Sequence, residues 1–323
     1  MSSGEKFLQM LICIALFFGV VAVILLLTSK LRSRNGERIQ FLAFVLPAIA
    51  LIAIGLLYPA INTIWQSFRT NTATGGTQFD GLHNYHTVFT NSQELKVLRN
   101  TALWVALVPT VSTFVGLVYA VLVDRARMEK FAKGLIFLPM ALSLVGASLI
   151  WKFVYNYRSN ENDQIGLANQ ILKIFGFHTY DFLLTSPWNN FFLIVIMIWV
   201  QAGFAMTILS ASIKAIPEDI IEAATLDGVS GLKMFRYITV PSIRPSLIVV
   251  LTTISITTLK AFDIVRTATG GNFDTSVLAY EFYVQSFRSN NAGLGAAIAV
   301  LIFVLVMPIV VYNVRQMRKL EAR

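Results

Sequence analysis

Residues 294–314 read LGAAIAVLIFVLVMPIVVYNV, a run of 21 positions that contains no charged side chain. A bilayer core about 30 Å thick is crossed by a helix of roughly 20 apolar residues, so this run predicts a membrane span. Further runs of this kind occur from one end of the chain to the other. Together they predict an all-α, polytopic membrane protein with spans at residues 7–28, 41–67, 101–123, 134–154, 190–212, 245–264 and 294–314.

The composition supports the same fold class. Of the 323 residues, 56% are hydrophobic and 13% are charged, and the mean hydropathy is +0.67. An ordinary soluble domain has about 25% charged residues, so a soluble enzyme is excluded. Cys13 is the single cysteine, which rules out a disulfide framework and a cysteine-based metal site. Since it lies inside the first apolar run, we interpret it as a packing residue.

The first apolar run could be a retained helix or a cleaved signal peptide. Its length from Phe7 to Thr28 exceeds the roughly 7 to 15 residues of a signal-peptide core. Lys30, Arg32 and Arg34 follow it, where a signal peptide would have a cleavage site of small residues. We therefore expect residues 1–38 to form an additional N-terminal transmembrane helix with a basic cytoplasmic linker, followed by a six-span domain at 39–323.

The basic residues predict the orientation of the spans. Sixteen Lys and Arg residues lie in the loops at 30–38, 124–133, 213–244 and 315–323, whereas seven lie in the alternate loops at 68–99, 155–189 and 265–292. Positive residues favour the cytoplasmic side, so the N-terminus is expected outside and the C-terminus inside. The net charge of +9 then reflects topology, and no nucleic-acid partner is expected. Aromatic residues near the span ends fit an interfacial belt: Trp151, Tyr155, Tyr157, Trp188, Tyr280 and Tyr283.

The cytoplasmic loop after the fifth span begins with residues 215–228, AIPEDIIEAATLDG. Pro217 fits the first turn of a helix, where Glu218 and Asp219 complement the positive end of the helix dipole. Gly228 suits a left-handed C-terminal cap about three turns later.

Ser230 can open a second short helix that runs through Phe235 and Ile238 and that Pro241 and Pro245 stop. Two short helices at an angle would present small and apolar faces suited to a partner's groove. A surface-lying helix pair that has no partner is the alternative.

The spacing in this loop resembles the EAA loop of binding-protein-dependent ABC importer permeases. The matching residues are Glu222, Ala223, Ala224, Asp227, Gly228, Phe235, Ile238, Pro241 and Pro245. Val229 stands where that family usually has alanine, and Val240 where it usually has leucine. Both are changes of volume that leave the pattern intact.

Shorter elements are similar to the carbohydrate-type permeases, and in particular to the alpha-glucoside and maltose type. They are Tyr58-Pro59, Gly81-Leu82-His83-Asn84-Tyr85, Asn100-Thr101, Phe137-Leu138-Pro139 and Thr269-Gly270-Gly271. Asn272 and Phe273 replace the more common Gly-Pro after the last of these. The resemblance covers about residues 41–314 and makes the first helix an addition to the usual six-span core.

The resemblance implies one half of a sugar importer in a prokaryotic cytoplasmic (inner) membrane. It assigns coupling to a cytoplasmic ATPase dimer to Glu222, Ala223, Ala224, Asp227, Gly228 and Pro241. The chain has no GxxxxGK[ST] sequence, so ATP and Mg²⁺ are expected on the ATPase and no cofactor on this chain. The other implied partners are a second, related permease, an extracytoplasmic sugar-binding protein, the sugar and membrane lipid.

The substrate path is sought among polar groups in mid-span, where they are costly and usually functional. Gln201 with Phe204 is one cluster, and the polar run Thr253–Asp263, with Thr257 and Thr258, is the other. The alternative for each Thr is a hydrogen bond to its own helix. Lys260 and Asp263, three apart on a predicted helix, are expected to pair or to reach the outer surface.

Catalytic and metal chemistry are not expected. His83, His86 and His178 lie in outer loops without the carboxylate spacing of a metal site, and residues 166–178 predict a surface helix. The competing functions are a self-contained secondary carrier or channel, a membrane scaffold, and an ABC permease for a non-sugar solute such as a glycerol phosphate.

Overall fold

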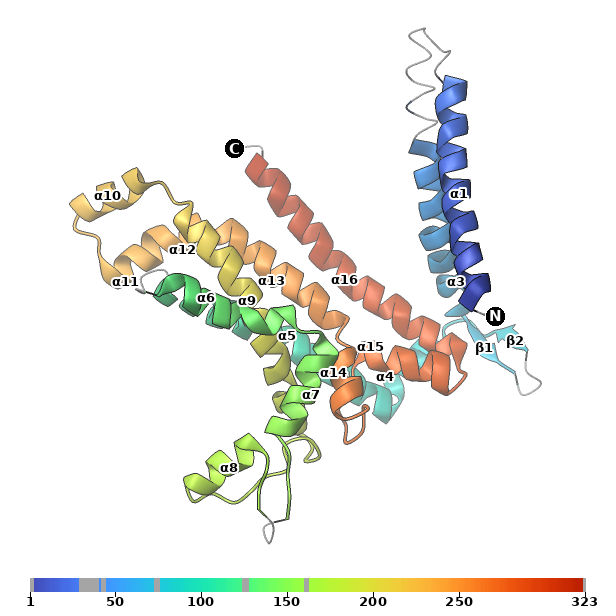
Figure 1. Cartoon of the computed structure of the whole chain (residues 1–323). Coiled ribbons are helices and arrows are strands. Elements are labelled where there is room, and N and C mark those ends of the chain that lie inside the picture. The colour runs from blue at the N-terminus through green and yellow to red at the C-terminus, as the bar shows by residue number, and fades with distance from the viewer. Residues whose placement is uncertain are drawn as a thin grey trace. The chain divides into compact units, whose positions relative to one another are not determined.

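The computed structural model describes residues 3–28, 41, 45–72, 76–123, 128–159 and 163–321. The chain divides into two compact units, Met1–Trp65 and Gln66–Arg323 (Figure 1). The basic linker predicted after the first span and the side chain of Cys13 lie outside the described residues.

The first unit consists of helices with exposed apolar surfaces. Helix α1 (Ser3–Thr28) has an apolar section, Leu8–Val23, that is shorter than the other candidate spans. A second helix covers Val45–Gln66 and includes the π-helical turn η1 (Ala53–Leu57) and α3 (Tyr58–Gln66). Pro59 lacks the N–H that an α-helix needs there, and the wide turn of η1 lets the helix continue past it.

Long helices form the core of the second unit. Helix α5 (Ser92–Val123) packs most extensively against α9 (Asn189–Lys214) and also against α13 (Arg244–Leu259). Buried side chains such as Trp104, Leu193 and Ile254 fill the space between them. Gly116 permits the close approach, because a Cβ atom there would lie 2.7 Å from the backbone nitrogen of Met206. Helix α16 (Ala292–Glu321) packs on α13.

Two further apolar segments are bent helix pairs. Helix α6 (Glu129–Phe137) with η2 (Leu138–Ala141) meets α7 (Leu144–Val154) at 102°, where one span was predicted at 134–154. Pro139 stands at the start of η2, and the Ser143 hydroxyl accepts a hydrogen bond from the Gly146 N–H at 3.0 Å. Because this bond caps a new helix, α7 begins in a new direction.

The second pair joins Gly231–Ser242 to α13 at 68°. By length and composition, four described helices could cross a membrane, or six if each bent pair is one span. The count of seven remains a prediction. The end of α13 corrects one expectation: Lys260 caps this helix and Asp263 begins the next, α14 (Asp263–Ala268), so the two do not share a helix.

A small hairpin was not foreseen by the all-α prediction. Strands β1 (Arg69–Asn71) and β2 (Thr77–Phe79) pair antiparallel, with Arg69 opposite Phe79. Helix α4 (His83–Thr90) follows and holds the hairpin, because the Asn84 amide donates to the carbonyls of Ser67 and Arg69, each at 2.9 Å.

The remaining described helices are short. Helix α8 (Leu167–Ile174) confirms the surface helix predicted at 166–178. Helix α15 (Leu278–Tyr283) continues into the π-helical turn η4 (Val284–Arg288) and packs against α16. Figure 1 shows α8 beyond one end of α9 and the helices of the 213–244 loop beyond the other.

Candidate functional site

The loop between α9 and α13 forms the two short helices predicted from the sequence. The first is α10 (Glu218–Leu226). Gly228 has a φ of 76°, and Val229 N donates to Ala224 O at 2.9 Å while Gly228 N donates to Thr225 O at 3.0 Å. This pair of bonds is the Schellman cap that the glycine predicted. Pro217 precedes the helix as its N-cap, one position before the first turn where it was expected.

The second helix consists of α11 (Gly231–Met234), the π-helical turn η3 (Phe235–Thr239) and α12 (Val240–Ser242). Pro241 was predicted to stop it, but lies within it and is exposed. The wide turn of η3 directly before the proline relieves the clash that an α-helical turn would produce. The chain bends instead at Ile243, and Pro245 occupies the first turn of α13.

Helix α10 is exposed along almost its whole length. Ala224 is its one buried residue at 7% exposure, while Leu226 is 89% exposed and Ile220 and Ile221 are also open to the surroundings. Glu222, Ala223, Asp227 and Gly228, which the resemblance assigns to coupling, are exposed as well. No other described helix or strand packs extensively on α10.

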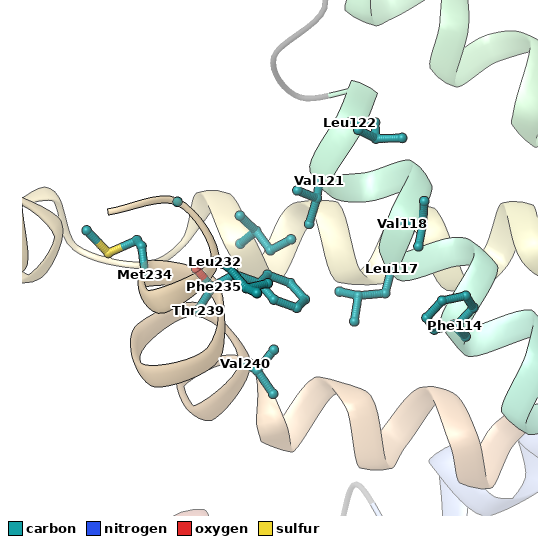
Figure 2. A pocket seen from close by; sticks show the side chains of 12 residues that line it. Phe114, Leu117, Val118, Val121, Leu122, Leu232, Met234, Phe235, Thr239 and Val240 are labelled. Carbon is teal, nitrogen blue, oxygen red and sulfur yellow. The ribbon is translucent and has the colours of Figure 1, made fainter. Parts of the chain in front are cut away.

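An apolar cavity of about 570 Å³ separates the second loop helix from α5 (Figure 2). The side of α5 contributes Leu117 and Val121, and the loop contributes Leu232, Phe235 and Val240. Figure 2 shows the Phe235 ring directed toward Leu117 across this space. The second loop helix is therefore loosely seated on the helix beside it.

Ion pairs anchor the base of the loop. Glu129, at the start of α6, accepts from Lys133 at 2.8 Å and from Lys214, the last residue of α9. Lys133 also donates to the Ser210 hydroxyl. A second cavity of about 490 Å³ lies beside these lysines, between α6 and α9. The contacts join α6 to α9 immediately before the exposed loop begins.

The residues predicted for the substrate path lie on two helices that pack together, α9 and α13. Gln201 is half-buried on α9, and Phe204 packs against the core. Gln201 is thirteen positions from Lys214 and Thr257 is thirteen positions from Arg244, so both sites lie about 20 Å along their helices from the loop. Among the described residues, no hydrogen bond joins Gln201 or Phe204 on α9 to the two threonines on α13.

The two threonines bond to their own helix, which was the alternative left open by the sequence. Thr257 Oγ1 donates to Thr253 O at 2.9 Å, and Thr258 Oγ1 donates to Ile254 O at 2.7 Å. Thr258 is buried, with 3% of its surface exposed. Each hydroxyl oxygen can still accept a hydrogen bond from a ligand, but the hydroxyl hydrogen is already donated to a carbonyl of its own helix.

A polar clamp at the other end of the helices was missed by sequence reasoning. Phe273 and Asp274 have φ values of 56° and 60°. The Asn100 amide donates to Asp274 O at 2.6 Å, the Asn190 amide donates to the same oxygen at 3.0 Å, and the Asn189 amide donates to Phe273 O at 2.7 Å. Asn100-Thr101 was noted as a motif, but its partner about 170 residues away along the chain was not visible from spacing.

The Asp274 side chain belongs to the same clamp. It accepts from Lys96 at 2.8 Å and from the Ser186 hydroxyl at 3.3 Å. The hydrogen-bonded Lys96 lowers the pKa of this carboxyl from its usual value. Asp274 is therefore held in its charged form at neutral pH.

The histidines are placed without a metal-binding arrangement. His83 and His86 are exposed on α4, and His178 is exposed after α8. Within the described part of the chain, no three His, Cys, Asp or Glu residues gather in a way that could hold a metal ion.

Two comparisons identify relatives of the chain. Residues 97–319, more than half of the chain, match the family described as binding-protein-dependent transport system inner membrane component. The alpha-glucoside transport system permease protein AglF of Rhizobium meliloti (strain 1021) is 44% identical over 299 residues, 92% of this chain and 86% of AglF. The osmoprotective compounds uptake permease protein GgtC of Synechocystis sp. is 45% identical over 278 residues, 86% of this chain and 99% of GgtC.

A more distant sequence relative and a solved structure extend the comparison. The trehalose/maltose transport system permease protein MalF of Thermococcus litoralis is 33% identical over 298 residues, 87% of this chain and 94% of MalF. The fold resembles a chain of a bacterial ABC transporter that imports the acidic polysaccharide alginate, with a TM-score of 0.74 and 20% identity over 89% of this chain and 99% of that one.

The family match and the permease relatives together define the class of protein as a membrane transport component. The chain belongs to the family of binding-protein-dependent transport system inner membrane components. Its place is accordingly the inner membrane.

Proposed function

We propose that the chain is a permease subunit of an ATP-driven ABC importer for sugars, with an alpha-glucoside or related oligosaccharide as the substrate class. Relatives named for alpha-glucosides and for trehalose and maltose, matched over most of their length, support this class. In this proposal the chain provides half of the translocation path, and a second, related permease provides the other half.

The exposure of α10 carries the coupling part of the proposal. An isolated helix of nine residues is below the roughly 12 to 15 residues needed for marginal stability in water, so docking on a partner would stabilise α10. Its small face at Ala223 and its apolar residues Ile220 and Ile221 suit the groove of a partner. The partner is a cytoplasmic ATPase dimer, with Glu222 meeting polar or cationic groups in its cleft.

The transport cycle follows from this docking. ATP and Mg²⁺ bind to the ATPase subunits, whose closure draws two coupling loops together and rocks the membrane halves about a midplane site. The cavity between the second loop helix and α5 gives the loop room to move relative to its own span. Gln201, Phe204, Thr257 and Thr258 are the proposed path residues on this half.

The opposite face receives a sugar-binding protein outside the membrane. This requires the N-terminus outside and the C-terminus in the cytoplasm, as the distribution of Lys and Arg predicts. The alginate transporter that shares this fold was solved in complex with a periplasmic protein carrying an alginate pentasaccharide, which supports a docking partner on that side.

Co-purification of the tagged chain in mild detergent, followed by mass spectrometry, tests the assembly. We expect a P-loop ATPase and a second permease. Ala223→Cys in a Cys13→Ala background should form a crosslink to the ATPase, and Lys173→Cys on α8 serves as the matched exposed control that should not. A chain that purifies alone, forms no crosslink and still moves sugar after reconstitution would replace this proposal with a secondary carrier.

A second candidate concerns the solute. The relative with 45% identity is named for osmoprotective compounds, so a solute of that kind is the alternative to an alpha-glucoside as the substrate. Uptake of a labelled disaccharide in the presence of unlabelled osmoprotectants separates the two, because only a shared substrate inhibits the uptake.

A further inference from the structure

Two arginines converge on one aromatic ring just beyond the end of α13. The Arg266 Cζ atom, on α14, lies 4.5 Å from the centre of the Tyr283 ring and 5.5 Å from that of Phe262. The Arg288 Cζ atom, at the end of η4, lies 5.8 Å from the same Tyr283 ring. A guanidinium within about 6 Å of a ring centre is held by the ring's negative face. Two positive charges are thus gathered at one tyrosine.

Neighbouring rings hold this tyrosine in place. Phe262 meets the Tyr283 ring edge-on at 5.2 Å between centres, and Phe287 lies 5.7 Å from it. Behind them, the buried Tyr280 donates its hydroxyl to Gly270 O at 2.8 Å. The arginines therefore rest on a prearranged aromatic base.

The positive charges are not neutralised within the described chain. Neither guanidinium comes within 4.0 Å of a carboxylate oxygen of any described residue. Glu281, close by in sequence, is buried and accepts from Ser276 and Gln285 instead. The Arg266 guanidinium, followed by that of Arg288, lowers the pKa of the Tyr283 phenol from its usual value. The patch is therefore a site of unbalanced positive charge.

The patch is a surface, not an enclosed pocket. Arg266 and Arg288 are exposed, and Phe287 is 70% exposed. The cavities of about 570 and 490 Å³ described above are lined by other residues. Small solutes are usually held in concave sites, whereas exposed Arg and Tyr side chains are typical of the strongest contacts between proteins. This geometry favours a macromolecular partner.

The place of the patch in the fold indicates which partner. Helix α14 lies at the opposite end of α13 from the coupling loop, and Thr257 and Thr258 lie in the last turn of α13 (Figure 1). On the proposed function, this end faces outward and receives the sugar-binding protein.

We propose that Arg266 and Arg288, positioned by Tyr283, bind a carboxylate side chain of the extracytoplasmic sugar-binding protein and align its bound sugar with the path. This rests on the proposed function. A guanidinium group can bind a carboxylate through two parallel hydrogen bonds, and the charge of the two arginines also accelerates the encounter with an acidic surface.

The test measures ATP hydrolysis by the whole transporter in proteoliposomes while sugar-loaded binding protein is titrated. The Arg266→Ala/Arg288→Ala variant should raise the half-saturating concentration of binding protein about tenfold, as expected for loss of a strong interface contact. The rise should shrink at high salt. Hydrolysis without binding protein should stay unchanged, since this patch lies away from the coupling loop.

Matched variants make the outcome decisive. Arg158→Ala/Lys173→Ala removes two exposed positive charges elsewhere on the same predicted side and should leave the titration unchanged. An equal rise in this control, or an unchanged titration in the Arg266/Arg288 variant, overturns the proposal. If the double Ala variant fails to assemble, Arg266→Gln/Arg288→Gln keeps planar side chains on the rings and is measured instead.

An anionic solute could bind the two arginines in place of a protein carboxylate, and uptake assays with glucuronate distinguish the two ligands. Inhibition of uptake by glucuronate in the wild type that disappears in the variant, with unchanged docking, would assign the patch to an anionic solute and overturn the proposal. A wild-type transporter that no binding protein stimulates contradicts the proposed function itself.

Discussion

Phe273 occupies a backbone conformation that explains why its neighbourhood departs from the sequence pattern it resembles. Its φ of 56° is inaccessible to proline, whose ring fixes φ near about −65°. The usual Gly-Pro at positions 272 and 273 is therefore incompatible with this turn. Left-handed non-glycine residues are strained by about 1–2 kcal/mol each, and the buried amides of Asn100, Asn189 and Asn190 supply compensating hydrogen bonds.

Removing one of these amides tests the clamp. Asn100→Ala deletes the donor to Asp274 O, which keeps its bond from Asn190, and removes the donor to the buried Ser276 O, so the free energy of unfolding should fall by about 1–3 kcal/mol. Phe273→Gly should instead keep or raise stability, because glycine adopts positive φ without strain. Thermal unfolding of both purified variants checks this. An Asn100→Ala variant as stable as the wild type would show that the clamp does not hold the turn.

Phe204 is the proposed path residue best suited to a test, because an aromatic face can stack on a sugar. Phe204→Ala should raise the half-saturating sugar concentration for uptake about fivefold, a loss of about 1 kcal/mol of aromatic contact. Phe204→Leu keeps much of the packing against the core and controls for stability.

The two threonines provide the comparison. Thr257→Val and Thr258→Val remove hydroxyls that already bond to their own helix, so each should change uptake less than Phe204→Ala does. Unchanged uptake in Phe204→Ala over a range of sugar concentrations would remove that residue from the path.

At the scale of elements, two prolines lie inside helices that continue past them, and only Pro241 departs from what the sequence predicted. Pro59 follows the π-helical turn η1, and Pro241 follows η3. A proline in an α-helix clashes with the carbonyl four residues earlier, so Pro241 was predicted to end its helix. The wider π turn moves that carbonyl aside. A proline in the sequence does not show whether the helix ends there or continues through a π-helical turn, because that outcome depends on the packing around the proline.

The Gly228 cap links the two helices of the coupling loop and can be tested without a steric clash. A Cβ atom at this position would meet no other atom of this chain within 4 Å, so within the chain any effect must come from the backbone. Gly228→Val should strain the left-handed cap by at least about 1–2 kcal/mol and lower uptake and stimulated ATP hydrolysis severalfold, with normal membrane insertion. Uptake assays and immunoblots of the membrane fraction measure both.

Gly228→Asn is the matched variant for this cap. Asparagine tolerates the left-handed conformation, so it should retain most of the activity although it is similar in size to valine. Equal losses in both variants would point to side-chain bulk at the partner interface, and full transport by Gly228→Val would remove the coupling role of this cap.

Local patterns predicted the elements better than their contacts. The apolar runs, the surface helix α8 and the Gly228 cap were all readable from the sequence, because each depends on residues close together along the chain. The hairpin β1–β2, the end of α13 at Leu259 and the clamp on Phe273 were not. The hairpin depends on side-chain bonds from Asn84 to Ser67 and Arg69, and the clamp depends on Asn189, 84 residues away along the chain, and hydrophobic periodicity carries no information about such pairs.

At the scale of the whole molecule, Lys and Arg are distributed unevenly between alternate loops. This distribution predicts that the two proposed docking faces lie on opposite sides of the membrane. On the proposed function, the coupling loop at one end of α13 contacts the ATPase, and the patch formed by Arg266 and Arg288 lies at the other end. Both proposals therefore depend on one orientation, with α10 in the cytoplasm. If the chain were inverted, neither partner could reach its surface.

Cysteine labelling measures this orientation directly. In a Cys13→Ala background, Ser289→Cys in the exposed segment after η4 should react with a membrane-impermeant maleimide in intact spheroplasts. Ala223→Cys on α10 should react only after permeabilisation, since the distribution of Lys and Arg predicts that its loop lies inside. Both positions are exposed in the structure, so a difference in reactivity reflects the side of the membrane and not burial. The reverse pattern would place α10 outside, where no ATPase is available, and would remove the coupling proposal together with the docking patch.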